Sequence, residues 1–467
     1  MKPSRTTAIF LLIFLAAAPL LGWASDPVVR IEGDRLTLDV DNQPLAAVLE
    51  KLAAQDIRIR IDPEINPRIT AKFNRRAIGS AMSGLLKSVD YALIWRKDRS
   101  SDKDEPRLWE IRIFYRGQEA RIRPLEKSAN LDIVTGDGAL YVKDILLLRL
   151  APGMTEADLA VLMDRLGATL VDVYPPLRVA RILLPHGSDV PAIAKKIAET
   201  GGIESAEPDY AYPLEGGRTA PTGTWTSIPP VTAIPSSDAA TVAVMDSGLS
   251  RDYADNAFVQ AAYDAVSPGA AVGDAMGHGT QMALIAAGAV NPLGTGTEAA
   301  AGSPVVAIRA FDDNGYTSTY TLMRGMDFAI ENGARVLSLS WGSETASTLL
   351  ESATRYAAAR GLVLVAAAGN SPTGQPVYPA AYENVIGVGA LNPDGEAWDQ
   401  SNYGDFVSVF APGLADLPVG YKGDPGIYAG TSIATAYTAR RVAAILSRNP
   451  RADQKTILKI LAQENEK

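Results

Sequence analysis

The sequence contains no cysteine and only two histidines in its 467 residues. The absence of cysteine excludes disulfide bonds, zinc sites built from thiolates and a cysteine nucleophile. Two histidines also argue against a metal centre held by several imidazoles. Any imidazole that acts as a general base must therefore be His186 or His278.

The sequence also lacks an excess of basic residues. It has 44 lysines and arginines and 53 aspartates and glutamates, which gives a net charge of -9 at pH 7. This balance argues against a nucleic-acid partner or an anionic membrane surface. Hydrophobic residues make up 47% and charged residues 21%, which is typical of a globular protein. The length allows roughly two to four domains.

Long apolar runs are absent except for one near the beginning, at residues 8–21. Lys2 and Arg5 precede this run and Gly22-Trp23-Ala24 follows it, a pattern typical of a secretory signal peptide at residues 1–24. A single membrane anchor is the alternative, but the run is short for a membrane span. We expect an exported protein, periplasmic or extracellular, with no transmembrane segment once the signal is removed.

Residues 26–117 combine short strand patterns with two amphipathic helical patterns, which predicts a small α+β module. The strands are predicted at residues 35–40, 57–61, 69–73, 91–95 and 108–113, and the helices at 44–54 and 77–87. The eleven residues from Gln43 and the seven from Ile59 resemble the short N-terminal domain of secretins and TonB-dependent receptors. This resemblance implies docking onto another envelope protein. A generic small domain with no partner is the alternative.

A mixed polar stretch at residues 118–141 is predicted to be a linker, and a second module follows at residues 142–212. Its pattern has the order strand, helix, strand, strand, helix, strand, which predicts a ferredoxin-like fold. His186 falls in a turn between a strand and a helix, and we interpret it as a surface residue without a catalytic role. Residues 213–235 are rich in proline, glycine and threonine, which indicates a second linker and a processing site.

The remainder, residues 236–460, is rich in alanine and glycine and alternates strand-like runs with helical patterns. The strands are predicted at residues 241–245, 305–310, 336–340, 363–367 and 385–388. Their continuous apolar character predicts an α/β domain with a parallel sheet between helices. In such domains, catalytic groups gather where the strands end.

Four polar residues stand at the ends of these elements. Asp246 and Asn370 each follow a buried strand, whereas His278 begins an apolar helix between two glycines. Ser432 leads into an Ala-rich helical run, where its hydroxyl can attack a carbonyl while its own N–H steadies the oxyanion. Taken singly, each has an ordinary alternative: a turn aspartate, a buried histidine, a turn asparagine and a helix cap.

The combination is specific. The motifs Asp-Ser-Gly, His-Gly-Thr, Ala-Ala-Gly-Asn and Gly-Thr-Ser-Ile-Ala occur in this order, and together they resemble the signature of the subtilisin-like serine proteases. The resemblance implies that Ser432 is the nucleophile, that His278 is the base and that Asp246 orients His278. Asn370 and the N–H of Ser432 would form the oxyanion hole.

Further segments extend this resemblance. Ser340, Trp341 and Gly342 match the strand that binds peptide substrates, and Ala367, Ala368 and Gly369 match the pocket for the side chain before the cleaved bond. No charge is evident in that pocket, so we expect small or apolar side chains there. The module at residues 142–212 resembles the propeptides of these proteases, which implies that it assists folding and plugs the substrate cleft.

Three positions depart from the family pattern. The family usually has histidine or another conserved residue type at the place of Gln281, proline at the place of Ala436 and glycine at the place of Arg440. Because the chemical groups are intact, these changes predict an atypical or slow enzyme rather than an inactive one. The implied chemistry needs no cofactor. Structural calcium is common in the family, but no cluster of carboxylates at ligand spacing is evident in the sequence.

The sequence thus predicts an exported serine endopeptidase that is made as a zymogen and acts on proteins or peptides. The alternative is a low-activity envelope scaffold whose protease-like domain is tethered through residues 26–117. An α/β-hydrolase esterase lacks support, since no Gly-x-Ser-x-Gly surrounds Ser432 and the order of the triad differs.

Overall fold

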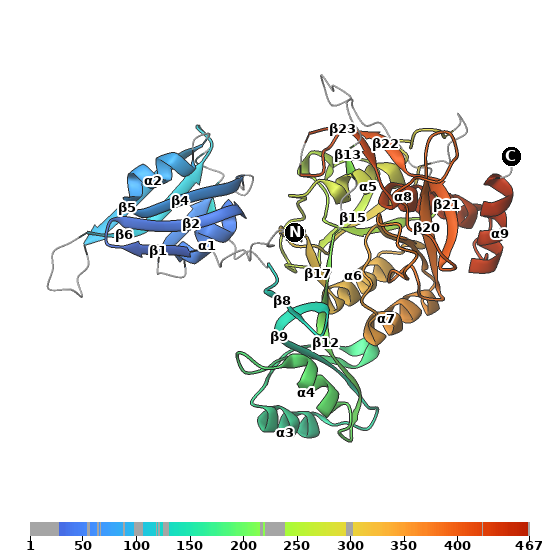
Figure 1. Cartoon of the computed structure of the whole chain (residues 1–467), viewed down its shortest axis with the longest axis horizontal. Helices are drawn as coiled ribbons and strands as arrows, with labels where there is room; N and C mark the ends of the chain where they lie inside the picture. Colours follow the sequence, from blue (N-terminus) through green and yellow to red (C-terminus); the bar gives the residue numbers. More distant parts are fainter. Residues whose placement is uncertain are drawn as a thin grey trace, which may run out of the picture. The chain divides into compact units, whose positions relative to one another are not determined.

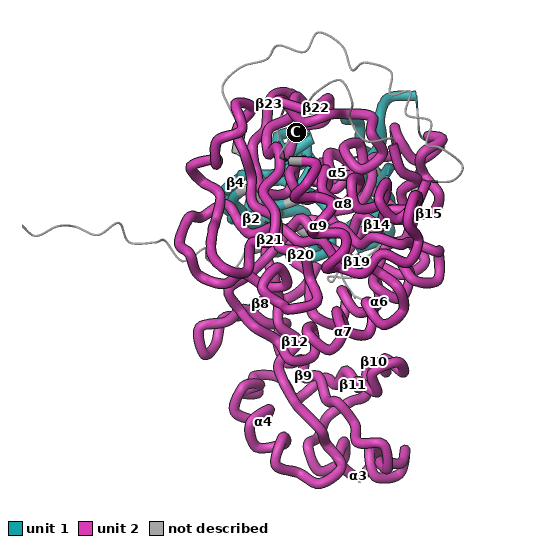
Figure 2. Tube along the Cα trace, turned by 90° about the vertical axis from the view of Figure 1, so that its right-hand side faces the viewer, with its two compact units in different colours: residues 1–127 teal, residues 128–467 magenta. Residues whose placement is uncertain are grey.

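The computed structural model divides the chain into two units, residues 1–127 and 128–467, which we describe separately (Figures 1 and 2). The structure describes residues 28–53, 57–62, 65, 67–86, 89–97, 106–117, 119, 122–124, 130–214, 218–219, 239–295, 302–422 and 424–465. The predicted signal peptide and most of the second predicted linker lie outside these residues. No helix in the described part of the chain is long and apolar enough to cross a membrane.

The first unit is a small α+β module with two sheets, whose strand orders are β1-β2-β4 and β5-β6-β3-β7. The helices and strands predicted here all form. They are β1 (Val28–Glu32), β2 (Arg35–Pro44), α1 (Leu45–Ala53), β3 (Arg58–Ile61), β4 (Arg68–Ala77), α2 (Ile78–Leu85), β5 (Asp90–Lys97), β6 (Pro106–Phe114) and β7 (Arg123–Pro124). Leu45, Leu49 and Leu52 of α1 are buried against Ile59 and Ile111, so this unit has a core of its own.

The second unit begins with a ferredoxin-like module, as the pattern predicts. Its sheet has the antiparallel order β10-β11-β9-β12, and β8 also pairs with β9. The elements are β8 (Ile133–Gly136), β9 (Ala139–Leu150), α3 (Glu156–Leu166), β10 (Thr169–Tyr174), β11 (Val179–Leu183), α4 (Val190–Ile197) and β12 (Ile203–Pro213). Along β9, Leu146 and Leu148 pack with α3 and α4, whereas Leu147 faces the larger domain.

The structure differs from the predicted linker at residues 118–141. From Ile133 onward this stretch forms β8 and the start of β9, joined as a hairpin by Asp137 and Gly138. Both turn residues have positive φ angles, 50° and 79°, which the two-residue turn of a tight hairpin requires. The Asp-Gly pair is therefore a hairpin signal that the polar composition concealed.

The larger domain is the predicted α/β fold, with a seven-stranded sheet in the order β15-β16-β14-β18-β19-β20-β21. All neighbouring strands in this sheet are parallel. The strands are β14 (Val242–Asp246), β15 (Val259–Asp264), β16 (Val305–Arg309), β18 (Val336–Leu339), β19 (Val363–Ala367), β20 (Val385–Leu391) and β21 (Val407–Pro412). The helices are α5 (His278–Ala286), α6 (Thr319–Glu331), α7 (Thr348–Ala359), α8 (Thr431–Arg448) and α9 (Gln454–Asn465).

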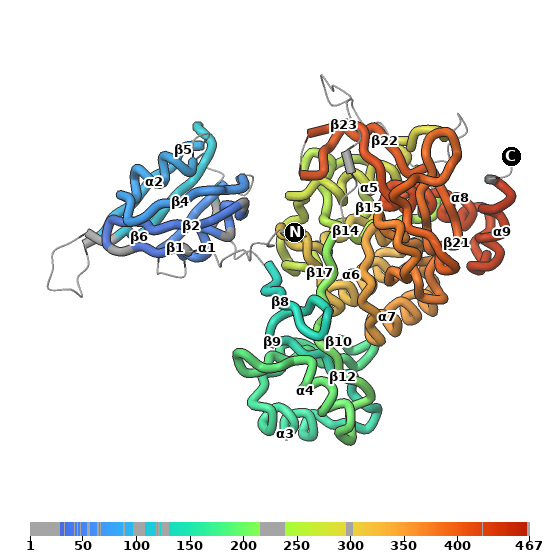
Figure 3. The backbone as a smooth tube through the Cα atoms, viewed as in Figure 1, coloured from blue at the N-terminus to red at the C-terminus, as the bar shows by residue number. Residues whose placement is uncertain are grey.

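Two hydrophobic cores lie on the two faces of this sheet. Residues of α5, α8 and α9 pack in one core, and residues of α6 and α7 pack in the other (Figure 3). The second core also contains Leu147, Tyr174 and Tyr212 of the ferredoxin-like module. This module is therefore packed onto α6 and α7, while its own helices α3 and α4 lie on the other side of its sheet.

Strand β12 connects the two parts directly. Its last residues, Ala211 to Pro213, pair antiparallel with β17 (Tyr316–Ser318) of the larger domain. A second small sheet of that domain contains β13 (Arg218–Thr219), β22 (Leu414–Leu417) and β23 (Gly426–Ala429), in the order β13-β23-β22.

Candidate active site

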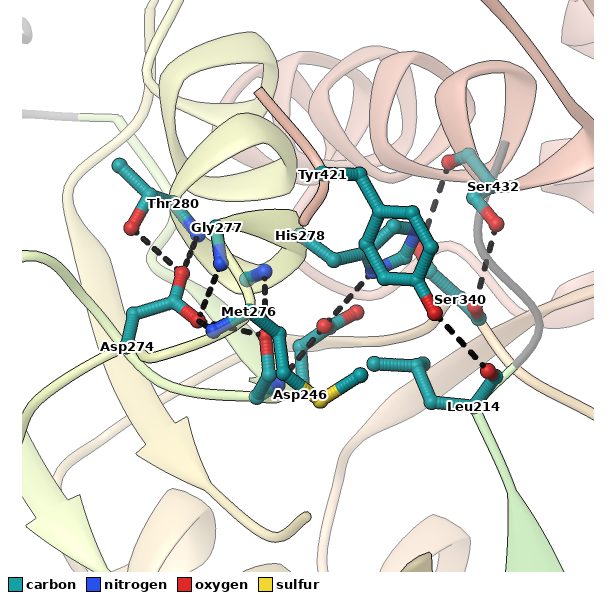
Figure 4. A network of polar contacts seen from close by, with 12 residues as sticks. Leu214, Asp246, Asp274, Met276, Gly277, His278, Thr280, Ser340, Tyr421 and Ser432 are labelled. Atoms are coloured by element: carbon teal, nitrogen blue, oxygen red, sulfur yellow. Dashed lines mark hydrogen bonds and ion pairs between the residues drawn. The ribbon is translucent and has the colours of Figure 1, made fainter. Parts of the chain in front are cut away.

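Asp246 and His278 form a buried pair. Asp246 is the last residue of β14, and His278 is the first residue of α5. The Nδ1 of His278 lies 2.7 Å from the Oδ1 of Asp246, and each residue is 1% exposed (Figure 4). Because a carboxylate only accepts hydrogen bonds, Nδ1 carries the proton, and Nε2 is left as the basic nitrogen.

The pKa of His278 reflects two opposing effects. Burial disfavours the imidazolium and lowers the pKa, whereas the charge of Asp246 and its hydrogen bond raise it. The charge of Asp274 adds to the second effect, and the net pKa lies above the ordinary value for histidine. The site therefore stabilises the imidazolium that forms when His278 accepts a proton.

Asp274 fixes the start of α5, and the sequence analysis missed it. Its Oδ1 accepts hydrogen bonds from the Oγ of Ser247 and the N–H of Gly277, both at 2.8 Å. Its Oδ2 accepts from the N–H and the Oγ1 of Thr280, at 2.8 and 2.6 Å. An acidic residue just before a helix start is the signal that could have identified it.

Ser432 is the second residue of α8, which Gly430 precedes as the N-cap residue. Its Oγ donates to the carbonyl of Ser340 at 3.1 Å, and the Oγ of Ser340 donates back to the carbonyl of Ser432 at 3.3 Å. The Nε2 of His278 has no hydrogen-bond partner among the described residues. The hydroxyl of Ser432 is therefore bound to the Ser340 carbonyl and not to His278.

Asn370 lies just beyond β19 and faces the start of α8. Its Oδ1 accepts from the backbone N–H of Thr431 at 2.9 Å and from the Thr431 Oγ1 at 3.0 Å. With its oxygen held in this way, the amide has Nδ2 as its donor. Asn370 is thus tied to the residue that immediately precedes Ser432.

The residues predicted to bind substrate lie at the ends of β18 and β19. Trp341 is 1% exposed, and its ring lies 5.5 Å from Tyr212 of β12 and 5.9 Å from Phe311. Gly342 has no room for a side chain, because a Cβ would lie 2.4 Å from Val377. Ala367 and Ala368 are buried, and Gly369 has a positive φ of 99°.

Strand β12 lies beside Trp341. Tyr212 is fully buried, with its hydroxyl 3.0 Å from the Oγ1 of Thr319, and the N–H of Leu214 donates to the carbonyl of Gly315 at 2.8 Å. Backbone pairing with β17 and the aromatic contact with Trp341 therefore hold an extended segment that leads toward His278.

Two carboxylates of β12 cap helices of the larger domain. Glu207 accepts from the N–H and the Oγ1 of Thr348 at 3.1 and 2.9 Å and from the Oγ of Ser347, at the start of α7. Asp209 accepts from the N–H of Tyr320 at 3.0 Å, at the start of α6. Burial raises the pKa of both carboxyls. Hydrogen bonds oppose this effect at Glu207, and the charge of Arg181 together with hydrogen bonds opposes it at Asp209. An anion at a helix N-terminus is stabilising, so these contacts strengthen the association of the ferredoxin-like module with the larger domain.

His186 lies in the ferredoxin-like module and is not among the residues of this site. It is 84% exposed, and its Nδ1 lies 3.1 Å from the Oδ2 of Asp144 within the ferredoxin-like module. In the described part of the chain, no group of three or more histidine, aspartate or glutamate residues could hold a metal ion.

The unusual residues of α5 and α8 are accommodated by specific contacts. Ala436 is buried in the core. Arg440 is also fully buried, and it donates to the carbonyl of Ile285 at 3.2 Å and to the Oδ1 of Asn291 at 2.7 Å. No carboxylate pairs with Arg440 among the described residues, and burial lowers its pKa. A cation at the C-terminal end of α5 is favourable, so Arg440 joins α8 to α5 rather than disrupting the packing.

Comparison with known proteins agrees with this geometry. The model of the subtilase family matches residues 237–465, and the model of the fervidolysin N-terminal prodomain matches residues 128–209. The thermophilic serine proteinase of Bacillus sp. (strain AK1) is 31% identical over 326 residues, which cover 67% of this chain and 80% of that protein. Subtilisin Savinase of Lederbergia lenta is 34% identical over 212 residues, 45% of this chain and 77% of that protein.

Among solved structures, fervidolysin from Fervidobacterium pennivorans aligns with a TM-score of 0.56 at 24% identity. The alignment covers 72% of this chain and 60% of the fervidolysin chain. Fervidolysin is described as a keratinolytic enzyme related to subtilisin. At 24% identity the similarity between the two chains concerns the fold.

Proposed function

The chain belongs to the subtilase family of serine proteases and carries a prodomain before its protease domain, and from this we propose that Asp246, His278, Ser432 and Asn370 perform the catalysis. The observation that supports the proposal most directly is the buried 2.7 Å hydrogen bond between His278 and Asp246. It leaves Nε2 of His278 as a base, and Ser432 stands at the N-terminus of α8.

The proposed reaction proceeds through an acyl-enzyme. His278 Nε2 removes the proton of Ser432 as Oγ attacks the carbonyl carbon of the peptide. The oxyanion accepts hydrogen bonds from the N–H of Ser432 and the Nδ2 of Asn370. His278 then gives its proton to the leaving amine, and a water molecule, activated by the same base, hydrolyses the ester.

We propose that the prodomain blocks this site until it is cut, so that the enzyme is made as a zymogen. The pairing of Ala211 to Pro213 with β17 supports this, because a substrate would add as a strand at the same edge. Tyr212 rests against Trp341, which supports a preference for an aromatic side chain at the corresponding substrate position. The expected preference for small or apolar side chains in the pocket at Ala367 to Gly369 stays a prediction.

Related subtilases are typically exported, and the pattern at residues 1–24 supports a secretory signal for this chain. We propose a periplasmic or extracellular location. The first unit has an independent core, which is consistent with the proposed role as a docking module for another envelope protein. Its similarity to the secretin and TonB-receptor domain stays a prediction.

Active-site labelling tests the proposed catalytic group. After removal of the prodomain, a fluorophosphonate probe is expected to label the protein, and Ser432→Ala is expected to prevent labelling. The exposed Ser408 on β21 supplies the matched control, since Ser408→Ala should label normally. Equal labelling of the wild type and Ser432→Ala would refute the assignment of the nucleophile.

The capping carboxylates give a second test, through inhibition by the separate prodomain, residues 128–214. Glu207→Ala is expected to raise its inhibition constant about 10- to 100-fold, because each buried donor left without a partner costs ~1–3 kcal/mol. The inhibition constant is measured against the mature protease with a chromogenic peptide. The exposed Glu199 serves as a control, and an equal effect of Glu199→Ala would contradict the capping role.

A further inference from the structure

A loop between β22 and β23 covers the catalytic histidine. Tyr421, in this loop, has its ring centroid 5.6 Å from that of His278, with the two rings nearly perpendicular at 77° (Figure 4). Neither the sequence motifs nor the proposed reaction assigns a role to this residue. Its position beside His278 places it next to any peptide that enters the site.

Specific contacts fix the loop to the start of α5. The Nε2 of Gln281 donates to the carbonyl of Val419 at 2.7 Å, and the N–H of Lys422 donates to the carbonyl of Met276 at 2.9 Å. The carbonyl of Gly420 approaches Gly277 so closely that a Cβ there would lie 2.1 Å from it. The unusual Gln281 is 1% exposed, and its side chain therefore serves as an anchor for this loop.

The hydroxyl of Tyr421 reaches the segment that runs into the site. It donates to the carbonyl of Leu214 at 3.4 Å, while the N–H of Leu214 donates to the carbonyl of Gly315 at 2.8 Å. Leu214 directly follows the residues of β12 that pair with β17. The main chain of Leu214 is thus held on both sides, by Gly315 at its N–H and by Tyr421 at its carbonyl.

We propose that Tyr421 is a substrate-binding residue, whose hydroxyl binds the main-chain carbonyl of the substrate residue that takes the position of Leu214. This inference rests on the proposed function, in which β12 marks the path of the substrate. Because the contact is to the backbone, it serves substrates of any sequence. The ring of Tyr421 covers His278 and shields it from water on that side.

Steady-state kinetics of the mature protease test this inference. Tyr421→Phe removes the hydroxyl and keeps the ring, so KM is expected to rise about three- to tenfold for peptides of different sequence, the size of one lost hydrogen bond. The value of kcat should stay within about twofold, and the pH profile of kcat should not move. Tyr115→Phe, at an exposed tyrosine of the first unit, is the matched control.

A second variant tests the anchor. Gln281→Leu is expected to raise KM in the same way, and the double variant with Tyr421→Phe should fall short of the product of the two single effects, because both act through one contact. If Tyr421→Phe has the KM of the control variant, or lowers kcat alone, the role of Tyr421 is wrong. If the wild type neither cleaves peptides nor reacts with the probe at Ser432, the proposed function itself fails.

Discussion

Replacement of Ser432 by alanine is expected to lower kcat about 10⁶-fold, the size of effect that follows removal of the nucleophile from a subtilisin. The variant keeps the helix start and the oxyanion donors but has no hydroxyl to form the acyl-enzyme. A precursor carrying Ser432→Ala should also remain uncut near residues 210–235. Electrophoresis of the incubated precursor and peptide hydrolysis by the separately processed variant measure the two effects.

The controls separate chemistry from folding. Wild-type enzyme added in trans should cut the Ser432→Ala precursor, and Ser408→Ala, at an exposed serine of β21, should mature without help. Unchanged thermal unfolding would show that the variant is folded. Cleavage of the isolated Ser432→Ala precursor at the wild-type rate would mean that another protease performs the maturation.

Asp246→Asn is expected to lower kcat about 10⁴-fold, because the asparagine amide no longer fixes the tautomer of His278 that leaves Nε2 basic. The substitution should also change the pH profile. The proposed reaction requires neutral His278, so activity is expected to fall as the pH drops through the pKa of this residue. Burial lowers that pKa and Asp246 raises it, so loss of the Asp246 charge should shift the acid limb to lower pH.

The pH dependence of kcat/KM between about pH 4 and 9 measures this shift. Asp255, which is exposed on the same domain, provides the control, and Asp255→Asn should leave both rate and profile unchanged. An acid limb that moves to higher pH in Asp246→Asn would contradict the electrostatic role of Asp246.

The sequence predicted those residues of the site that stand at the ends of strands. Asp246 and Asn370 follow apolar runs, and parallel strands bring their carboxyl ends to one edge, so their proximity could be inferred without coordinates. Asp274 stands just before a helix start, which is a local signal, but its contacts with Ser247 and Thr280 could not be inferred from it. Tyr421 could not be found from the sequence, because its role depends on how its loop packs against the start of α5, and no local pattern encodes that packing.

Two strands of the parallel sheet escaped prediction for a common physical reason. β15 and β21 are the two edges of the parallel sheet, and several of their residues remain partly exposed. Their sequences therefore lack the continuous apolar character by which the central strands were recognised. The Asp-Gly hairpin at residue 137 was hidden for a different reason, since turn residues resemble a polar linker in composition.

The buried Arg440 has a consequence for how this chain can change over generations. Its guanidinium depends on the amide of Asn291, and Gly288 lies so close that a Cβ there would be 3.3 Å from Nη1 and 2.9 Å from Gly302. Loss of Asn291 would leave the buried cation with fewer acceptors, and a side chain at Gly288 would displace it. The three positions are therefore epistatic: substitutions at Asn291 or Gly288 are expected to destabilise the chain less when position 440 is glycine than when it is arginine.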